Sequence, residues 1–229
     1  MERVADDETP ASTVVNVTNM NQRFMGDRTA GSVNKNIFNQ DSKDWCVSSV
    51  TNMNEMFSYS VLHNGGASGT SNNPLNGWQR GATGTLPAST VGNVTIMSSM
   101  FSNNIDFNQD ISGWDVGKVQ NMSSMFKNAS DFNKDIKDWN VSSVQTMTSM
   151  FEGATVFNNG GASGNSANPL NNWERPNANP ASTVANVINM SSMFKNADSF
   201  NQDIGTWNVS SVQNMTSMFE SATKFHQDI

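Results

Sequence analysis

Three aspartates, Asp110, Asp135 and Asp203, occupy the same place in a repeated Phe-Asn-x-Asp segment, and their spacing could support cation chemistry. If successive segments stack like neighbouring strands, about 4.8 Å apart, the three carboxylates form a column and repel one another. Either a backbone N–H caps each carboxylate, or a cation lies among them. Calcium suits carboxylate and amide oxygens. We expect backbone capping and no cofactor, because the segment lacks the glycine-rich repeat of calcium-binding β-rolls.

The other residues with catalytic potential form no constellation. His63 and His226 are the only histidines and Cys46 is the only cysteine, so the chain can form no intrachain disulfide. Zinc sites and Ser-His-Asp sets need several such residues at defined spacings. The sequence therefore predicts a protein that is not an enzyme.

Charge and hydrophobicity exclude two classes of partner. The chain has 229 residues, a formal net charge of -7 and only 14% charged residues. No basic patch could displace counterions from nucleic-acid phosphates. No apolar run is long enough to span a membrane, and the first ten residues lack the apolar core of a signal peptide. We expect neither nucleic-acid binding nor direct membrane insertion.

A 25-residue repeat organises the chain. Phe107, Phe132 and Phe157 follow one another at intervals of 25 residues, as do Phe200 and Phe225. A fixed period of this size predicts a solenoid in which each unit buries its apolar face against its neighbours. We expect one solenoid domain over 1–229. Its predicted units are a partial long unit at 11–37, short units at 38–61, 107–131, 132–156 and 200–224, long units at 62–106 and 157–199, and a partial unit at 225–229.

The apolar slots of one unit predict its local structure. In the unit that begins at Phe107 they are Phe107, Ile111, Trp114, Val116, Val119, Met122, Met125, Phe126 and Ala129. The last four fall at i, i+3, i+4 and i+7, the pattern of a short helix or 3-10 segment. The segment 107–111 has the length of a short strand that pairs with its equivalents, and 116–119 is a second extended piece. We therefore expect coils made of short parallel β-strands plus short helical or 3-10 segments.

Methionine and tryptophan recur in fixed slots. Of the 15 methionines, 13 lie in two slots beside phenylalanine, and all six tryptophans share one slot. A row of tryptophans could stack on sugars and a methionine stripe could bind soft metals. We expect both to fill the core.

The long units carry loops that could contact a ligand. Each has one insertion before and one after its Leu-x-x-Trp turn, rich in glycine, asparagine and proline. These loops either contact a ligand or are exposed to solvent without a role in binding. The candidate contact residues are Gly65, Gly66, Asn72, Asn73, Gln79, Arg80, Gly160, Gly161, Asn165, Asn168, Glu174 and Arg175.

The string WNVSSVQNMTSMF and the following FNQDI-type segment resemble the BspA-type leucine-rich-repeat surface protein family, over roughly 11–229. The resemblance implies a leucine-rich-repeat-like solenoid with a right-handed stack of coils. It also implies an extracellular or cell-surface location and a role in adhesion or recognition. It carries over no catalytic residue.

Three functions remain open on the sequence. The first is a recognition or adhesion module that binds a protein or glycan ligand through a face of the stack and its loops. The second is a structural protein that self-associates end to end, since neither end of the repeat shows a polar cap. The chain could equally be a segment of a longer array. The third, binding to a repetitive solid such as ice or a polysaccharide, needs a uniform polar face, and the exposed slots vary too much for it.

Overall fold

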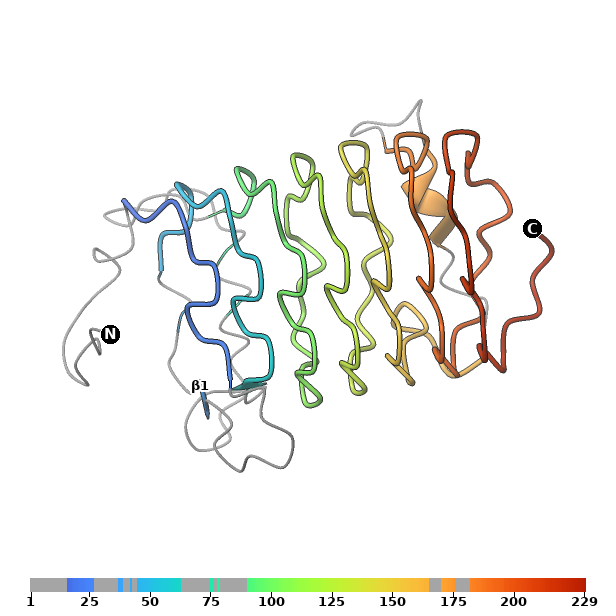
Figure 1. Ribbon diagram of the computed structural model, residues 1–229, viewed down its shortest axis with the longest axis horizontal. Helices are drawn as coiled ribbons and strands as arrows, with labels where there is room; N and C mark the ends of the chain where they lie inside the picture. Colours follow the sequence, from blue (N-terminus) through green and yellow to red (C-terminus); the bar gives the residue numbers. More distant parts are fainter. Residues whose placement is uncertain are drawn as a thin grey trace.

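The chain forms a row of stacked coils, with residues 16–26 near one end and 207–229 at the other (Figure 1). The computed structural model describes residues 16–26, 37–38, 42, 45–62, 75, 78, 90–164, 170–175 and 182–229. Within these residues, regular secondary structure is sparse. It consists of β1 (Ile37–Phe38), β2 (Val61–Leu62) and the 3-10 helix η4 (Leu170–Trp173). β1 and β2 pair in parallel, with Ile37 opposite Val61 and Phe38 opposite Leu62.

The expected fold class is therefore wrong. A leucine-rich-repeat-like solenoid, with short parallel strands and a helical or 3-10 segment in each coil, is not what the described residues form. Most of each coil consists of turns joined by irregular chain. The predicted helix and the predicted strand are absent from the described coils for different local reasons.

Apart from β1 and β2, parallel pairing between the coils that the structure describes occurs at single residues. The column of isolated bridges is formed by Asn19, Asn52, Ile96, Asn121, Thr146, Asn189 and Asn214. On one side of a bridge the N–H of Gln145 donates to the carbonyl of Gln120 in the preceding coil, at 2.8 Å. On the other side the N–H of Met122 donates to Thr146 in the following coil, at 3.1 Å. Each coil is thus bound to both neighbours without a continuous strand.

The predicted helix at Met122–Ala129 is replaced by successive turns. Ser124 and Asn128 both have φ of +57°, in the left-handed region that interrupts a helix. The N–H of Phe126 donates to Met150 in the next coil, while the N–H of Met125 donates to Met122 within its own turn. An α-helix would direct both to carbonyls four residues earlier. The apolar pattern is the same as that of a helix, but the hydrogen bonds alternate between the turn and the next coil.

The predicted strand at 107–111 is replaced by pairing through asparagine side chains. The Oδ1 of Asn108 accepts the N–H of Asn133 at 3.1 Å, and the Oδ1 of Asn133 accepts the N–H of Asn158 at 2.8 Å. The same bond joins Asn158 to Asn201 and Asn201 to His226, both at 2.9 Å. A side-chain oxygen takes the place of a backbone carbonyl, so no backbone ladder forms here.

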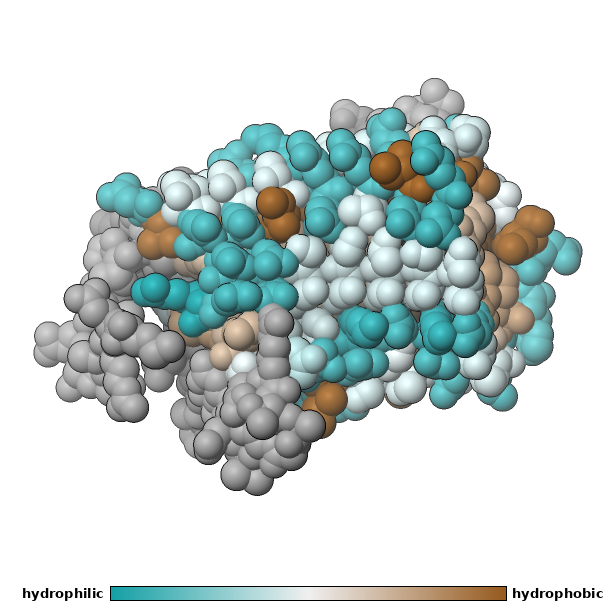
Figure 2. Space-filling view, in the orientation of Figure 1, coloured by the Kyte–Doolittle hydropathy of each residue, from teal (hydrophilic) through white to brown (hydrophobic). Residues whose placement is uncertain are grey.

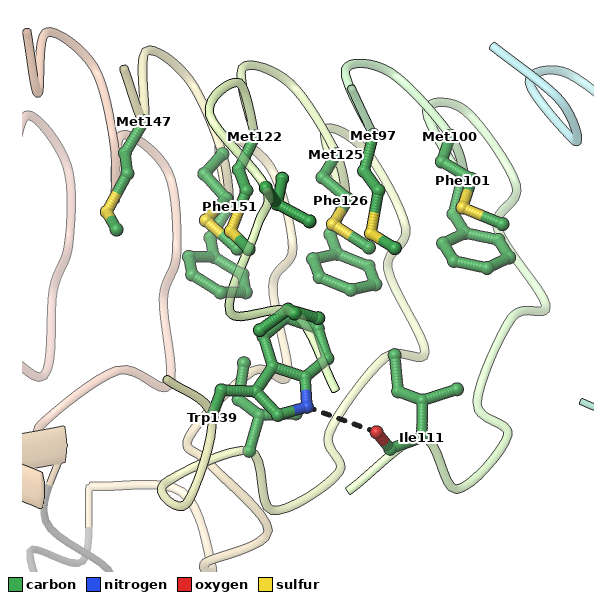
Figure 3. Packing of buried hydrophobic residues seen from close by; sticks show 14 of the residues in the cluster. Met97, Met100, Phe101, Ile111, Met122, Met125, Phe126, Trp139, Met147 and Phe151 are labelled. Carbon is green, nitrogen blue, oxygen red and sulfur yellow. Dashed lines mark hydrogen bonds between the residues drawn. The ribbon is translucent and has the colours of Figure 1, made fainter. Parts of the chain in front are cut away.

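The predicted core is confirmed. All nine apolar slots of the unit at 107–131 are at most 3% exposed. Methionines lie above the phenylalanine rings in adjacent coils, as Figure 3 shows for Met122, Phe126 and Phe151. The rings stack along the row, with centroids 5.5 Å apart between Phe126 and Phe151 and 5.7 Å apart between Phe132 and Phe157. Stacked aromatic rings add to the stability gained by burial.

The tryptophans bind the coils together. In five of the six tryptophans the indole N–H donates to a backbone carbonyl of the preceding coil, as Trp139 does to Ile111 at 3.1 Å (Figure 3) and Trp78 to Ser42 at 2.9 Å. The equivalent bonds run from Trp114 to Leu75, from Trp173 to Ile136 and from Trp207 to Leu170, at 3.0–3.2 Å. These four tryptophans and Trp78 are at most 7% exposed, so their rings are core rather than a surface for sugars.

Candidate functional site

An open polar groove crosses three adjacent coils on the outside of the stack. Its volume is about 580 Å³. Two columns of side chains line it. The residues are Gln120, Ser142, Ser143, Gln145, Asn186 and Ile188. None of the six is charged or aromatic, so the groove suits an uncharged, polar ligand.

One wall of the groove is the glutamine column, which we define as Gln120, Gln145, Ile188 and Gln213. Backbone bonds hold the column in line: the N–H of Ile188 donates to Gln145, and the N–H of Gln213 donates to Ile188. The side-chain amides of Gln120 and Gln145 are exposed and make no hydrogen bond with any residue that the structure describes. An amide offers two donors and a carbonyl acceptor, so these two side chains can bind a ligand from both sides.

The other wall is held rigidly. The Nδ2 of Asn186 donates to the carbonyl of Ser142 at 2.7 Å, and the Oγ of Ser143 donates to the carbonyl of Gly117 at 2.5 Å. The Oγ of Ser142 accepts the N–H of Thr183 at 3.2 Å. These bonds fix the wall before a ligand arrives, which reduces the entropy lost on binding.

The sequence places both walls by repeating one turn. In the Val141-Ser142-Ser143-Val144 turn the two valines are buried and the two serines are half-buried. The Oδ1 of Asn140 caps the turn by accepting the N–H of Ser142 at 3.1 Å, an Asx turn. The residue after the second valine is glutamine in three units, at Gln120, Gln145 and Gln213. That glutamine, repeated directly after the second valine, is the sequence signal that marks this wall of the groove.

Four of the twelve predicted loop contacts, Gly160, Gly161, Glu174 and Arg175, lie within the described residues, and none of these four lines the groove. Gly65, Gly66, Asn72, Asn73, Gln79, Arg80, Asn165 and Asn168 lie outside the described residues. Gly160 and Gly161 contact the asparagine column, which is formed by Asn108, Asn133, Asn158 and Asn201 in successive coils. The N–H of Gly160 donates to the Oδ1 of Asn133 at 2.9 Å, and the Nδ2 of Asn133 donates to the carbonyl of Gly161 at 3.0 Å. The glycines therefore fasten the insertion to the coil beneath it.

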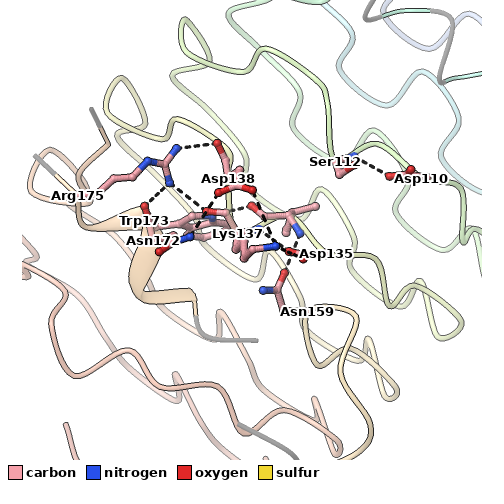
Figure 4. A network of polar contacts seen from close by, with 10 residues as sticks. Asp110, Ser112, Asp135, Lys137, Asp138, Asn159, Asn172, Trp173 and Arg175 are labelled. Carbon is pink, nitrogen blue, oxygen red and sulfur yellow. Dashed lines mark hydrogen bonds and ion pairs between the residues drawn. The ribbon is translucent and has the colours of Figure 1, made fainter. Parts of the chain in front are cut away.

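Glu174 and Arg175, also predicted as contacts, make bonds inside the protein. The guanidinium of Arg175 donates to the carbonyls of Asn172, Lys137 and Asp138 (Figure 4). The carboxylate of Glu174 accepts the hydroxyl of Thr183 at 2.8 Å and the N–H of Val184 at 3.1 Å. Arg175 therefore connects the long unit at 157–199 to the coil before it, whereas Glu174 connects that unit to itself and, by accepting the N–H of Asn208 at 3.2 Å, to the coil after it.

The three aspartates are capped by backbone, as expected. The Oδ1 of Asp110 accepts the N–H of Ser112 at 3.0 Å (Figure 4), and Asp203 accepts that of Gly205 at 2.9 Å. Asp135 accepts the N–H of Lys137 at 3.0 Å and also pairs with its ammonium group. Among the described residues no cluster of three or more acidic, histidine or cysteine side chains could hold a metal ion.

A charged column alternates in sign on the outer surface. Lys127 pairs with Glu152 at 2.9 Å, and Lys195 pairs with Glu220 at 2.7 Å. Burial acts to raise the pKa of Glu152, but hydrogen bonds from Ser149 and Lys127 and the charges of Lys127 and Lys195 outweigh it and lower that pKa. Opposite charges in successive coils favour the register observed here.

The outer face as a whole is polar. Figure 2 shows neutral and hydrophilic residues over most of the visible face, with a few apolar positions and an apolar cluster at the end of the stack that holds the C terminus. Val209 and Met215, each 40% exposed, belong to this last coil. No helix in the described part of the chain has the length and apolar character that crossing a membrane requires.

One family model matches the chain, at residues 11–79, 82–182 and 177–229. Its description is "Mycoplasma protein of unknown function, DUF285". No curated protein and no solved structure matches the chain. Because the matches cover nearly the whole repeat, the chain belongs to the DUF285 family of mycoplasma proteins of unknown function.

Proposed function

We propose that the protein is a non-enzymatic recognition or adhesion module that acts at a cell surface or outside the cell. Its ligand, a protein or glycan, would bind in the polar groove. The observation that carries the proposal is the pair of exposed amides, Gln120 and Gln145, which have no partner among the described residues and share a wall with the exposed side chain of Ile188. The resemblance of the repeat to BspA-type surface proteins supports the same role.

The architecture favours recognition over chemistry. Rigid stacked coils present a fixed surface, and binding to a fixed surface loses little conformational entropy. The ion pairs that the structure describes, such as Lys127 with Glu152, involve none of the residues that line the groove. A surface that positions uncharged donors and acceptors can hold a ligand, but it offers no acid and no base in its lining.

The test is attachment of the immobilised chain to a panel of purified extracellular matrix proteins and cell-surface polysaccharides. The informative variant is Gln120→Ala/Gln145→Ala. Gln213→Ala is the matched control, since it removes the same side chain from the same column outside the groove. We expect retention of one class of ligand to fall with the groove variant and to persist with the control. Equal retention of every ligand by the wild type and the groove variant would reject the proposal.

The oligomeric state of the same samples should be measured by light scattering. If the chain were a filament subunit instead, its mass would rise with concentration, and the groove variant would leave that rise unchanged.

A further inference from the structure

We propose that the groove binds a neutral, unbranched β-linked glycan that runs along the stack, across three coils. This inference rests on the proposed recognition function and specifies its ligand. It follows from the uncharged lining, from the free amides and from the spacing of the coils.

The lining selects against charged ligands. A carboxylate, sulfate or phosphate group is bound most strongly by a cationic partner, and the lining of the groove contains none. The nearest lysine in the sequence, Lys118, precedes Gln120 by two residues and donates to the Oδ1 of Asn93 at 2.6 Å. Uncharged hydroxyl groups match the amides and serine hydroxyls of the lining, because each can donate and accept at once.

The backbone of the glutamine column selects against peptides. An extended peptide binds by adding its own N–H and C=O groups to an open edge. Here that edge is closed, since Gln145 donates to Gln120 and accepts from Ile188 through its backbone. A peptide laid along the column would advance about 3.3 Å per residue against a coil spacing of about 4.8 Å, so its groups would drift out of register with the side chains.

A β-linked glycan has the matching repeat. One ring of an extended β-1,4-linked chain advances by nearly the spacing of about 4.8 Å that backbone pairing sets between coils. Successive rings would then meet Gln120, Gln145 and Ile188, which lie in three successive coils of the lining. The amides would bind ring hydroxyls, and the exposed Ile188 would contact the apolar face of a ring. With no aromatic residue in the lining, each ring contributes little, so affinity should grow with chain length.

The experiment is a nuclear magnetic resonance titration of the isotope-labelled chain with cellohexaose and chitohexaose, both neutral and β-linked. The readout is the side-chain amide signals of Gln120 and Gln145. We expect at least one neutral hexasaccharide to shift these signals with a Kd of about 1 mM or tighter. The matching trisaccharide should bind more weakly, and the β-linked hexamer of mannuronic acid should bind at least about tenfold more weakly than the neutral hexamer.

Variants separate binding in the groove from binding elsewhere. In Gln120→Ala/Gln145→Ala the hexasaccharide should no longer shift the amide signals of the other lining residues, Ser142, Ser143, Asn186 and Ile188. Gln213→Ala should leave those shifts unchanged. Ile188→Gln, which continues the column with the residue found in neighbouring coils, should weaken binding without removing it. Backbone amide spectra of each variant confirm folding.

Two results would overturn the inference. One is the absence of any shift at Gln120 and Gln145 with both neutral hexasaccharides at millimolar concentration. The other is binding of the mannuronate hexamer as tight as that of the neutral ones. If the attachment test finds a protein ligand that requires Gln120 and Gln145 while the neutral glycans fail here, the recognition function stands and the glycan assignment falls.

Discussion

The indole N–H of Trp139 donates to the backbone carbonyl of Ile111, one coil away, at 3.1 Å, and both side chains are at most 1% exposed. That buried carbonyl also accepts the N–H of Trp114 at 3.1 Å, so the indole of the next coil is its second donor. The indole bond recurs at the same corner in successive coils, so this corner is held by tryptophan where a sheet would use backbone pairing.

Replacement of Trp139 by phenylalanine should destabilise the protein. The ring stays aromatic, but the carbonyl of Ile111 loses one of its two donors and keeps the N–H of Trp114, so the expected cost is that of one hydrogen bond, about 0.5–1.5 kcal/mol. Urea unfolding followed by circular dichroism measures the loss. Phe132→Leu is the control, because it removes aromatic area without removing a hydrogen bond. An unfolding midpoint for Trp139→Phe equal to that of the wild type would contradict the role of the bond.

Gly153→Ala should also destabilise the protein, because its backbone has φ of +71°. A side chain in this left-handed conformation costs about 1–2 kcal/mol. An added Cβ would also lie 2.3 Å from the Oδ1 of Asn128, so that side chain must move. The same urea experiment gives the cost.

Two comparisons separate the contributions at Gly153. Gly117→Ala has no positive φ, and its added Cβ would meet only side-chain atoms, the nearest at 3.2 Å, so we expect a smaller effect. In Asn128→Ala/Gly153→Ala the contact is relieved, and its difference from Asn128→Ala gives the backbone cost at Gly153, because Asn128 itself has φ of +57° and donates to Asn103. A cost for Gly153→Ala no larger than that for Gly117→Ala would show that backbone conformation is unimportant here.

The core was predictable because burial follows the 25-residue period directly. Trp114, Met122 and Phe126 are each at most 3% exposed, as their fixed slots indicated. The helix was not predictable from the same slots. A sequence of turns with left-handed residues at Ser124 and Asn128 buries the same positions, and serine gives no clear signal of a positive φ.

The predicted strand failed for a different reason. The asparagine side chains do form hydrogen bonds from coil to coil, as in Asn108, Asn133 and Asn158. Each Oδ1 accepts the backbone N–H of the asparagine in the next coil, and this bond takes the place of backbone pairing between strands. The groove was missed because it forms where two columns of three coils meet, a relationship that no single segment displays. Its residues, such as Gln145 and Asn186, are 41 positions apart in the sequence.

The charged column should make stability depend on pH. The pKa of Glu152 is lowered from its ordinary value of 4.5 in the folded protein, so its pairing with Lys127 stabilises the fold above that value. The contribution is lost as the pH falls through the folded pKa. Glu152→Gln should therefore cost about 0.5–1 kcal/mol at neutral pH, less at high salt, and nothing in strong acid.

Thermal unfolding of Glu152→Gln and the wild type across the acidic range measures this dependence. Asp131→Asn is the control, since Asp131 is exposed and has no ion pair among the described residues. We expect the difference between Glu152→Gln and the wild type to shrink with acidity, while the control stays close to the wild type throughout. A constant difference at all pH values would mean that Glu152 contributes through packing rather than charge.

Asn133 should be among the costliest asparagines to remove. Its Oδ1 accepts two N–H groups, from Asn158 and Gly160, and its Nδ2 donates to Gly161. Asn133→Ala leaves the buried N–H of Asn158 without this acceptor, and we expect a loss of about 2–3 kcal/mol in urea unfolding. Asn133→Asp keeps the acceptor for both N–H groups but places a charged oxygen against the carbonyl of Gly161. Because the two N–H groups bind a carboxylate more strongly than an amide oxygen, this variant should still cost less than Asn133→Ala. If Asn133→Ala and Asn133→Asp are equally destabilised, the bond from the N–H of Asn158 to the Oδ1 of Asn133 is not the main contribution. The bond from the Nδ2 of Asn133 to Gly161 would then contribute more.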